Sequence, residues 1–140
     1  YMPEYRAVRD RYTFLDLCKD SDAAAEVTAT AVEVLGVDAA ILFADILLIL
    51  EPLGVGLEFA KGDGPVIHHP VRTPADVDAL PDVDPAAEVP FVYEAVRKAK
   101  AGLQVPLIGF AGAPFTLASY LIEGGGSRNY LRAKRLMYEA

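Results

Sequence analysis

Two continuous apolar stretches constrain the fold of this chain more than any other feature. Residues 39–44 read Ala-Ala-Ile-Leu-Phe-Ala, and residues 105–111 read Val-Pro-Leu-Ile-Gly-Phe-Ala. Both have the length of a strand, and a strand that is apolar on both faces is typical of a parallel sheet covered by helices. Because a helical pattern comes before each stretch, we expect an α/β fold.

Helical patterns surround these strands. Ser21, Thr73 and Ser127 are each expected to cap the start of a helix. Gly36 and Gly102 are expected to end two of the helices. The helices predicted in this way cover residues 22–35, 74–80, 90–101, 114–122 and 128–140.

The other segments are expected to be less regular. Residues 1–20 have weak periodicity and predict a loop that leads into a short helix. Residues 57–60 and 65–68 flank Lys61-Gly-Asp-Gly64, which predicts a β-hairpin with glycine in its turn. Residues 81–90 contain three prolines and are predicted to be mostly linker.

Two strands do not complete a sheet, and a (β/α)8 barrel needs about 250 residues. This chain has 140 residues, begins with Tyr1 rather than Met, and ends in a helical pattern that has no stop signal. We therefore expect residues 1–140 to be part of a single domain that is truncated at both ends.

Composition excludes several classes of protein. The formal net charge of −7 is unfavourable for nucleic-acid binding, which needs a basic face. The longest apolar stretch, residues 39–50, is too short to cross a membrane and contains Asp45. The single cysteine, Cys18, excludes an internal disulfide and suits a cytoplasmic protein. Its apolar surroundings predict a buried thiol rather than a nucleophile.

Two basic groups leave the binding of an anionic small molecule open, because local charge matters more than total charge. The alternative is that both groups are solvated faces. They consist of Arg6, Arg9 and Arg11 near the start, and of Arg128, Arg132, Lys134 and Arg135 near the end.

Asp45 follows the first apolar strand directly. In a parallel barrel, reactive side chains gather at the carboxyl ends of the strands. A partly desolvated carboxylate at this place must accept hydrogen bonds or shift its pKa. The alternative is that Asp45 is merely the N-cap of a helix over residues 46–50.

The second strand also leads into a candidate site. Gly109 and Gly112 would let the backbone approach a ligand closely. Tyr120 can present its hydroxyl to a ligand, or it can be a packed aromatic residue whose tip meets water. Residues 124–127, Gly-Gly-Gly-Ser, can bind an anion, form a mobile lid or serve as a plain connection. No metal site is expected, because the adjacent histidines at residues 68–69 lack a ligand cluster at metal spacing.

Taken together, three motifs make the chain similar to the uroporphyrinogen decarboxylase family. Tyr1-Met-Pro-Glu-Tyr-Arg6 resembles the continuation of a family signature whose preceding Arg-Gln-Ala-Gly-Arg is absent here. Phe43-Ala-Asp-Ile-Leu47 resembles Phe-Ser-Asp-Ile-Leu, with Ala44 in place of the serine. Residues 106–116 and 120–127 resemble a second signature. The resemblance extends along essentially the whole chain.

The resemblance implies an incomplete (β/α)8 TIM barrel that consists of two barrel strands, a β-hairpin and flanking helices. It implies a carboxy-lyase that converts uroporphyrinogen III to coproporphyrinogen III. It also implies that this enzyme is a cytoplasmic homodimer and needs neither metal nor organic cofactor. Asp45 and Tyr120 would be catalytic and bind substrate, whereas Arg9 and Phe110 would bind substrate only.

Two alternatives stay open. One is a corrinoid-dependent, zinc-using methyltransferase built on a related barrel, and the other is a non-catalytic binding module derived from the barrel. The family's later serine or threonine and histidine contacts are absent from these residues. We therefore expect residues 1–140 alone to be inactive and to aggregate through open strand edges.

Overall fold

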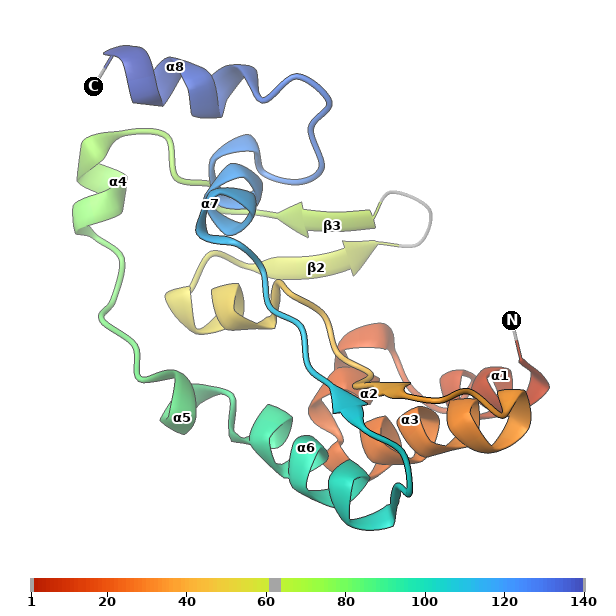
Figure 1. Cartoon of the computed structure of the whole chain (residues 1–140). Coiled ribbons are helices and arrows are strands. Elements are labelled where there is room, and N and C mark those ends of the chain that lie inside the picture. Colours follow the sequence, from red (N-terminus) through yellow and green to blue (C-terminus); the bar gives the residue numbers. More distant parts are fainter. Residues whose placement is uncertain (1, 61–63, 140) are drawn as a thin grey trace. The chain divides into compact units, whose positions relative to one another are not determined.

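The computed structural model describes residues 2–60 and 64–139 (Figure 1). The chain forms two compact units, which are described separately here. The first unit comprises Tyr1–Asp45 and Val89–Ala111, and the second comprises Ile46–Glu88 and Gly112–Ala140.

The first unit contains the two expected strands. They are parallel neighbours, with Ala40 opposite Leu107 and Ile41 opposite Ile108. Each is shorter than the apolar stretch that contains it. The elements of this unit are α1 (Pro3–Arg9), α2 (Phe14–Lys19), α3 (Ser21–Leu35), β1 (Ala40–Ile41), α6 (Pro90–Gly102) and β4 (Leu107–Ile108).

Two clusters of buried side chains form the core of the first unit. The larger cluster joins α3 and α6, which pack against each other, to the end of β1. The small alanine side chains at this contact allow the two helices to approach closely. The second cluster lies among α1, α2 and α3, and Phe43 packs against both clusters. The first cluster consists of Ala24, Leu42, Ala95 and Ala99, and the second consists of Val8, Leu17 and Ala23.

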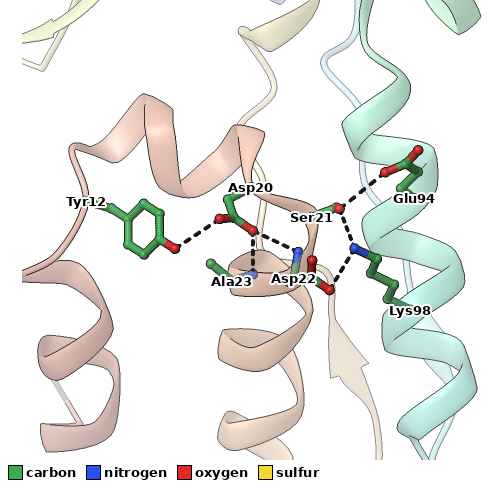
Figure 2. A network of polar contacts seen from close by, with 7 residues as sticks. All are labelled: Tyr12, Asp20, Ser21, Asp22, Ala23, Glu94 and Lys98. Atoms are coloured by element: carbon green, nitrogen blue, oxygen red, sulfur yellow. Dashed lines mark hydrogen bonds and ion pairs between the residues drawn. The ribbon is translucent and has the colours of Figure 1, made fainter.

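A polar network fixes the start of α3 (Figure 2). The Oδ1 atom of Asp20 accepts hydrogen bonds from two backbone N–H groups in the first turn of α3, both at 3.0 Å. The Tyr12 hydroxyl donates to Oδ2 of Asp20 at 3.0 Å. In α6, Lys98 Nζ donates to Ser21 Oγ at 2.8 Å and forms an ion pair with Asp22 at 2.7 Å. Asp20 is therefore the N-cap of α3, and the prediction that Ser21 caps this helix was wrong.

The second unit contains the expected hairpin. Its two strands are antiparallel, with Leu57 opposite Ile67, and the turn at residues 61–63 lies outside the described residues. An isolated bridge pairs Val66 of the hairpin with Gly125. The elements are a 3-10 helix η1 (Leu48–Leu53), β2 (Leu57–Ala60), β3 (Gly64–Ile67), α4 (Pro74–Asp78), α5 (Pro85–Glu88), α7 (Pro114–Glu123) and α8 (Leu131–Glu139).

Several helix predictions are confirmed. Thr73 forms a capping box with Asp76 at the start of α4, and Pro74 occupies the first turn. Gly36 ends α3 in the left-handed conformation, with φ of 62°. The predicted helices over residues 90–101 and 114–122 correspond to α6 and α7.

Two segments are more regular than predicted. Residues 1–20 contain α1 and α2 rather than a loop and one helix, and residues 81–90 contain the short helix α5. The Thr13 side chain accepts a hydrogen bond from the Asp16 backbone N–H and so begins α2. The helix α2 corresponds to the predicted short helix, whereas α1 and α5 were not predicted because helices of one or two turns show little periodicity.

The start of the last helix also differs from the prediction. Ser127 Oγ accepts a hydrogen bond from the Tyr130 backbone N–H at 3.1 Å, and α8 begins only at Leu131. The first turn of α8 is capped instead by Glu123 of α7. Its Oε1 atom accepts from the backbone N–H groups of residues 132 and 133 at 2.9 and 3.0 Å. This carboxylate also suits the positive end of the helix dipole.

Candidate active site

Asp45 and Phe110 follow the carboxyl ends of two neighbouring parallel strands. Asp45 comes four residues after β1 and is half-buried, and Phe110 comes two residues after β4 and is 48% exposed. Because β1 and β4 run in the same direction, both residues leave the same edge of the sheet. This is the edge at which parallel α/β proteins place their reactive groups.

Asp45 is not the N-cap of the segment that follows it. That segment forms the 3-10 helix η1, which begins at Leu48 and has Leu47 at its N-cap position without a side-chain cap. The alternative interpretation of Asp45 as the cap of a helix over residues 46–50 is therefore wrong. Residues 46–47 form a turn before η1 begins.

Arg9 lies at the end of α1, within the first unit. Its guanidinium donates a hydrogen bond to the Tyr12 carbonyl oxygen. It also lies over the Phe14 ring, with 5.8 Å between Cζ and the ring centroid, which is the geometry of a cation–π contact. The Phe14 ring contacts the Phe43 ring edge-on at 6.0 Å. Arg9 is thus connected through aromatic packing to the segment that ends at Asp45.

Cys18 is a buried thiol whose pKa responds to charges of both signs. Only 2% of the Cys18 surface is exposed. Burial is the main cause that raises the pKa of the Cys18 thiol to about 12, and the negative charge of Asp45 raises this pKa further, whereas the positive charge of Arg9 lowers it. The thiol therefore stays protonated at neutral pH and is a buried side chain rather than a nucleophile, as expected.

Tyr120 belongs to the second unit, on α7, where it is half-buried. Its carbonyl oxygen accepts the hydrogen bond from the Gly124 backbone N–H at 2.9 Å, which closes the helix. Gly124 has φ of 88°, a left-handed conformation that favours glycine. The structure thus brings Arg9, Asp45 and Phe110 into one unit and places Tyr120 in the other.

The glycines of the candidate site differ in their surroundings, and a Cβ atom on Gly109 would meet nothing within 4 Å. A Cβ atom on Gly112 would lie 2.5 Å from a side-chain carbon of Leu117 in α7, so the Leu117 side chain would have to shift to make room for it. A Cβ atom on Gly125 would lie 2.9 Å from the Pro65 carbonyl oxygen, next to the bridge with β3. The Ile67 backbone N–H also donates to the Gly124 carbonyl oxygen at 2.9 Å, so residues 124–125 pack on the hairpin.

The described residues contain no group of three or more His, Cys, Asp or Glu side chains that could hold a metal ion. The His68 ring instead pairs with Glu58 across the hairpin, at 2.7 Å between Nε2 and Oε2. In the described parts of the chain, no helix is long and apolar enough to cross a membrane. In both basic groups, arginines pair with nearby acids: Arg11 with Glu26 and Arg135 with Glu139.

The fold defines the class first. A methyltransferase from Methanosarcina mazei has a similar structure, with a TM-score of 0.60, over 78% of this chain and 36% of its own length. Their sequences are 21% identical, so the likeness concerns the fold alone. Together with the parallel β1–β4 pair and its helices, it confirms the expected class, an incomplete α/β barrel.

The family follows from the sequence. The family model "Uroporphyrinogen decarboxylase (URO-D)" matches residues 1–140. Three proteins named uroporphyrinogen decarboxylase are similar to this chain. The one from Carboxydothermus hydrogenoformans is 58% identical to it, the one from Chloroflexus aggregans 59%, and the one from Koribacter versatilis 56%. These matches cover 100%, 99% and 100% of this chain. The chain belongs to the uroporphyrinogen decarboxylase family.

The chain spans only part of these relatives. It matches 41%, 39% and 40% of their respective lengths. The motifs that suggested the family from the sequence lie within this part, and Tyr1, which begins the first of them, lies outside the described residues. The candidate site described above therefore includes only residues from this part.

Proposed function

We propose that the complete protein is a uroporphyrinogen decarboxylase. It removes CO2 from the four acetate side chains of uroporphyrinogen III and gives coproporphyrinogen III in tetrapyrrole biosynthesis. Family membership supports the reaction. The structural observation that carries the proposal is the half-buried carboxylate of Asp45 at the carboxyl end of β1, with Arg9 in the same unit.

Asp45 is proposed to stabilise the charge that the reaction creates. Protonation of a pyrrole α-carbon gives a cation whose charge spreads to the ring nitrogen. The electron pair of the C–CO2 bond then flows into this cation, and CO2 departs, so that an exocyclic methylene group remains. Protonation of the methylene carbon gives the methyl group, and loss of the proton from the α-carbon restores the pyrrole. A fixed carboxylate that accepts hydrogen bonds from the pyrrole N–H groups stabilises the cation without reorganisation of water. Charge-assisted hydrogen bonds of this kind contribute about 1.5–3 kcal/mol each.

The other three residues are proposed to bind substrate. Uroporphyrinogen carries eight carboxylates, and the planar guanidinium of Arg9 suits a carboxylate of the substrate rim. The exposed ring of Phe110 offers an apolar surface for the macrocycle. Tyr120 is proposed as a catalytic residue whose hydroxyl contacts substrate. The half-buried state of Tyr120 leaves part of its side chain accessible for this role.

The test compares two carboxylates, one before and one after β1 in the chain. A full-length protein containing these residues would be incubated with uroporphyrinogen under anaerobic conditions while product mass is followed. We expect stepwise loss of up to four CO2, and a decrease in kcat of about 10²–10³-fold in Asp45→Asn. Asp38→Asn is the matched control, because Asp38 is exposed before the amino end of β1. We expect this control to keep full activity.

Two outcomes would contradict the proposal. A well-folded full-length protein that releases no CO2 would remove the decarboxylase function, and zinc content and thiol methylation would be measured next. Equal activity of Asp45→Asn and Asp38→Asn would instead remove the role of Asp45 while leaving the reaction in place.

We also propose that the complete protein is a cytoplasmic homodimer that needs neither metal nor organic cofactor and does not bind nucleic acid. The family resemblance supports the assembly, and the net charge of −7 supports the absence of nucleic-acid binding. Light scattering during size-exclusion chromatography would give the mass of the assembly. A monomeric mass across the accessible concentration range would contradict the dimer. Activity retained after chelation would support catalysis without metal.

A further inference from the structure

The backbone that leads to Asp45 is held by a side chain of α3. The parallel ladder ends where the Leu42 backbone N–H donates to the Ile108 carbonyl oxygen at 3.1 Å. The next backbone N–H, that of Phe43, donates to Thr28 Oγ1 at 2.9 Å. Thr28 is 2% exposed, and its hydroxyl in turn donates to the Ala24 carbonyl oxygen at 2.8 Å. The Thr28 hydroxyl therefore binds the backbone one residue after the last hydrogen bond to the β4 segment, at an N–H group that β4 does not bind.

The same residue, Phe43, is also fixed through its ring. The ring lies 5.9 Å from the Tyr5 ring and 6.0 Å from the Phe14 ring, measured between centroids. Arg9 lies over the face of the Phe14 ring, with 5.8 Å between its Cζ atom and the ring centroid. Phe43 is thus anchored at its backbone by Thr28 and at its side chain by the aromatic residues that carry Arg9. A shift of Phe43 would move the path to Asp45 and the packing beneath Arg9 together.

We infer that Thr28 is a positioning residue of the active site: its buried hydroxyl holds the Phe43 peptide so that Asp45, two residues later, and Arg9 keep a fixed arrangement. This inference rests on the proposed decarboxylase function. Thr28 does not contact substrate in this role. A carboxylate stabilises a developing charge fully only when it is already in place, and a displacement of about 1 Å can cost about 100-fold in rate.

The experiment removes the hydroxyl and keeps the shape of the side chain. Thr28→Val in the full-length protein deletes both hydrogen bonds, whereas Thr28→Ser retains the hydroxyl. Ser21→Ala is the matched control, because Ser21 lies on the same helix, is buried, and makes its hydrogen bonds to α6 through Lys98 and Glu94 (Figure 2). The readouts are kcat and KM for uroporphyrinogen, urea unfolding, and hydrogen exchange of the Phe43 amide.

We expect Thr28→Val to lower kcat at least about 10-fold, to change KM less, and to lose protection of the Phe43 amide. Thr28→Ser is expected to retain most of kcat, and Ser21→Ala to retain it fully at a similar loss of stability. If Thr28→Val does not fold, Thr28→Cys, with a weaker hydrogen-bond acceptor, takes its place under the same expectations.

The outcomes separate this inference from the function on which it rests. An active wild-type protein with unchanged kcat in Thr28→Val would overturn the positioning role alone. Equal losses of kcat in Thr28→Val and Ser21→Ala would overturn it as well, because they would follow stability rather than position. A folded wild-type protein that releases no CO2 would overturn the proposed function, and the inference with it.

Discussion

Asp20 illustrates how one side chain can organise a helix start in this protein. The backbone N–H of Ala23 is the largest cause that lowers the pKa of the Asp20 carboxyl, followed by the Tyr12 hydroxyl. The same contact raises the pKa of Tyr12 above its ordinary value of 10.0. Folding therefore stabilises the ionised form of Asp20 and the neutral form of Tyr12, which are the forms that make this hydrogen bond.

The pH dependence of folding follows from these directions. The contribution of Asp20 is present above the ordinary carboxyl pKa of 3.8 and is lost as the pH falls through the lowered value. The contribution of Tyr12 is present below pH 10.0 and is lost as the pH rises through the raised value. Stability from this contact is thus confined to the range between about pH 4 and about pH 10.

We predict that Asp20→Ala lowers the free energy of unfolding of the full-length protein by about 1 kcal/mol at neutral pH, because α3 loses its N-cap. The difference from wild type should shrink as the pH falls towards about 3. Urea denaturation at both pH values measures this. Asp38→Ala, at an exposed loop position, is the control and should change stability little. A loss in Asp20→Ala that does not depend on pH would contradict the electrostatic part of the explanation.

At the scale of the element, the helices α3 and α6 were predicted well, whereas the barrel strands were predicted at the right place but too long. Glycine has different roles at the ends of these two helices. Gly36 ends α3 with φ of 62°, whereas Gly102 is the last residue of α6 and has no positive φ. A Cβ atom would meet nothing within 4 Å at either position, so only backbone conformation distinguishes them.

We predict opposite effects of the same substitution at these two glycines. Gly36→Ala should destabilise the protein by about 1 kcal/mol, because a residue with a Cβ atom is strained in the left-handed conformation. Gly102→Ala should stabilise it by a few tenths of a kcal/mol to about 1 kcal/mol, because alanine loses less backbone entropy in a helix. Thermal unfolding of both variants side by side checks the signs. If both substitutions change the stability in the same direction, the backbone conformation at the helix end does not decide stability here.

At the scale of the whole molecule, the described residues supply part of a barrel. Among them, β1 and β4 pair only with each other. Ile41 and Ile108 lie opposite each other and are 63% and 50% exposed. Apolar side chains on a strand pair with open edges favour association with other strands. The relatives are about two and a half times as long, and their additional residues could pair with these strand edges.

A polypeptide limited to residues 1–140 is therefore predicted to aggregate and to show no decarboxylation. Light scattering during size-exclusion chromatography and the uroporphyrinogen assay test the two parts of this prediction. The full-length protein at equal concentration is the control and should be monodisperse and active. A monodisperse, active polypeptide of residues 1–140 would show that these residues contain a complete site.

The sequence alone predicted what depends on neighbours along the chain. The helices α3, α4, α6 and α7, the hairpin and the two parallel strands follow from periodicity, capping residues and glycines within short windows. The choice of Asp45 as a candidate rested equally on its position directly after an apolar strand. The helix α1 escaped this reasoning, because so short a helix carries too little pattern.

Tertiary structure alone decided the contacts between residues distant in the chain. The Thr28 hydroxyl supports the Phe43 backbone fifteen residues later, and Glu123 of α7 caps α8 across a loop. The effects of the Asp45 and Arg9 charges on the pKa of the Cys18 thiol likewise follow from packing. No local pattern specifies such partners, because a hydroxyl or a carboxylate can satisfy many donors. Which donor it meets depends on how the helices and strands pack, and that packing places the charges of the candidate site.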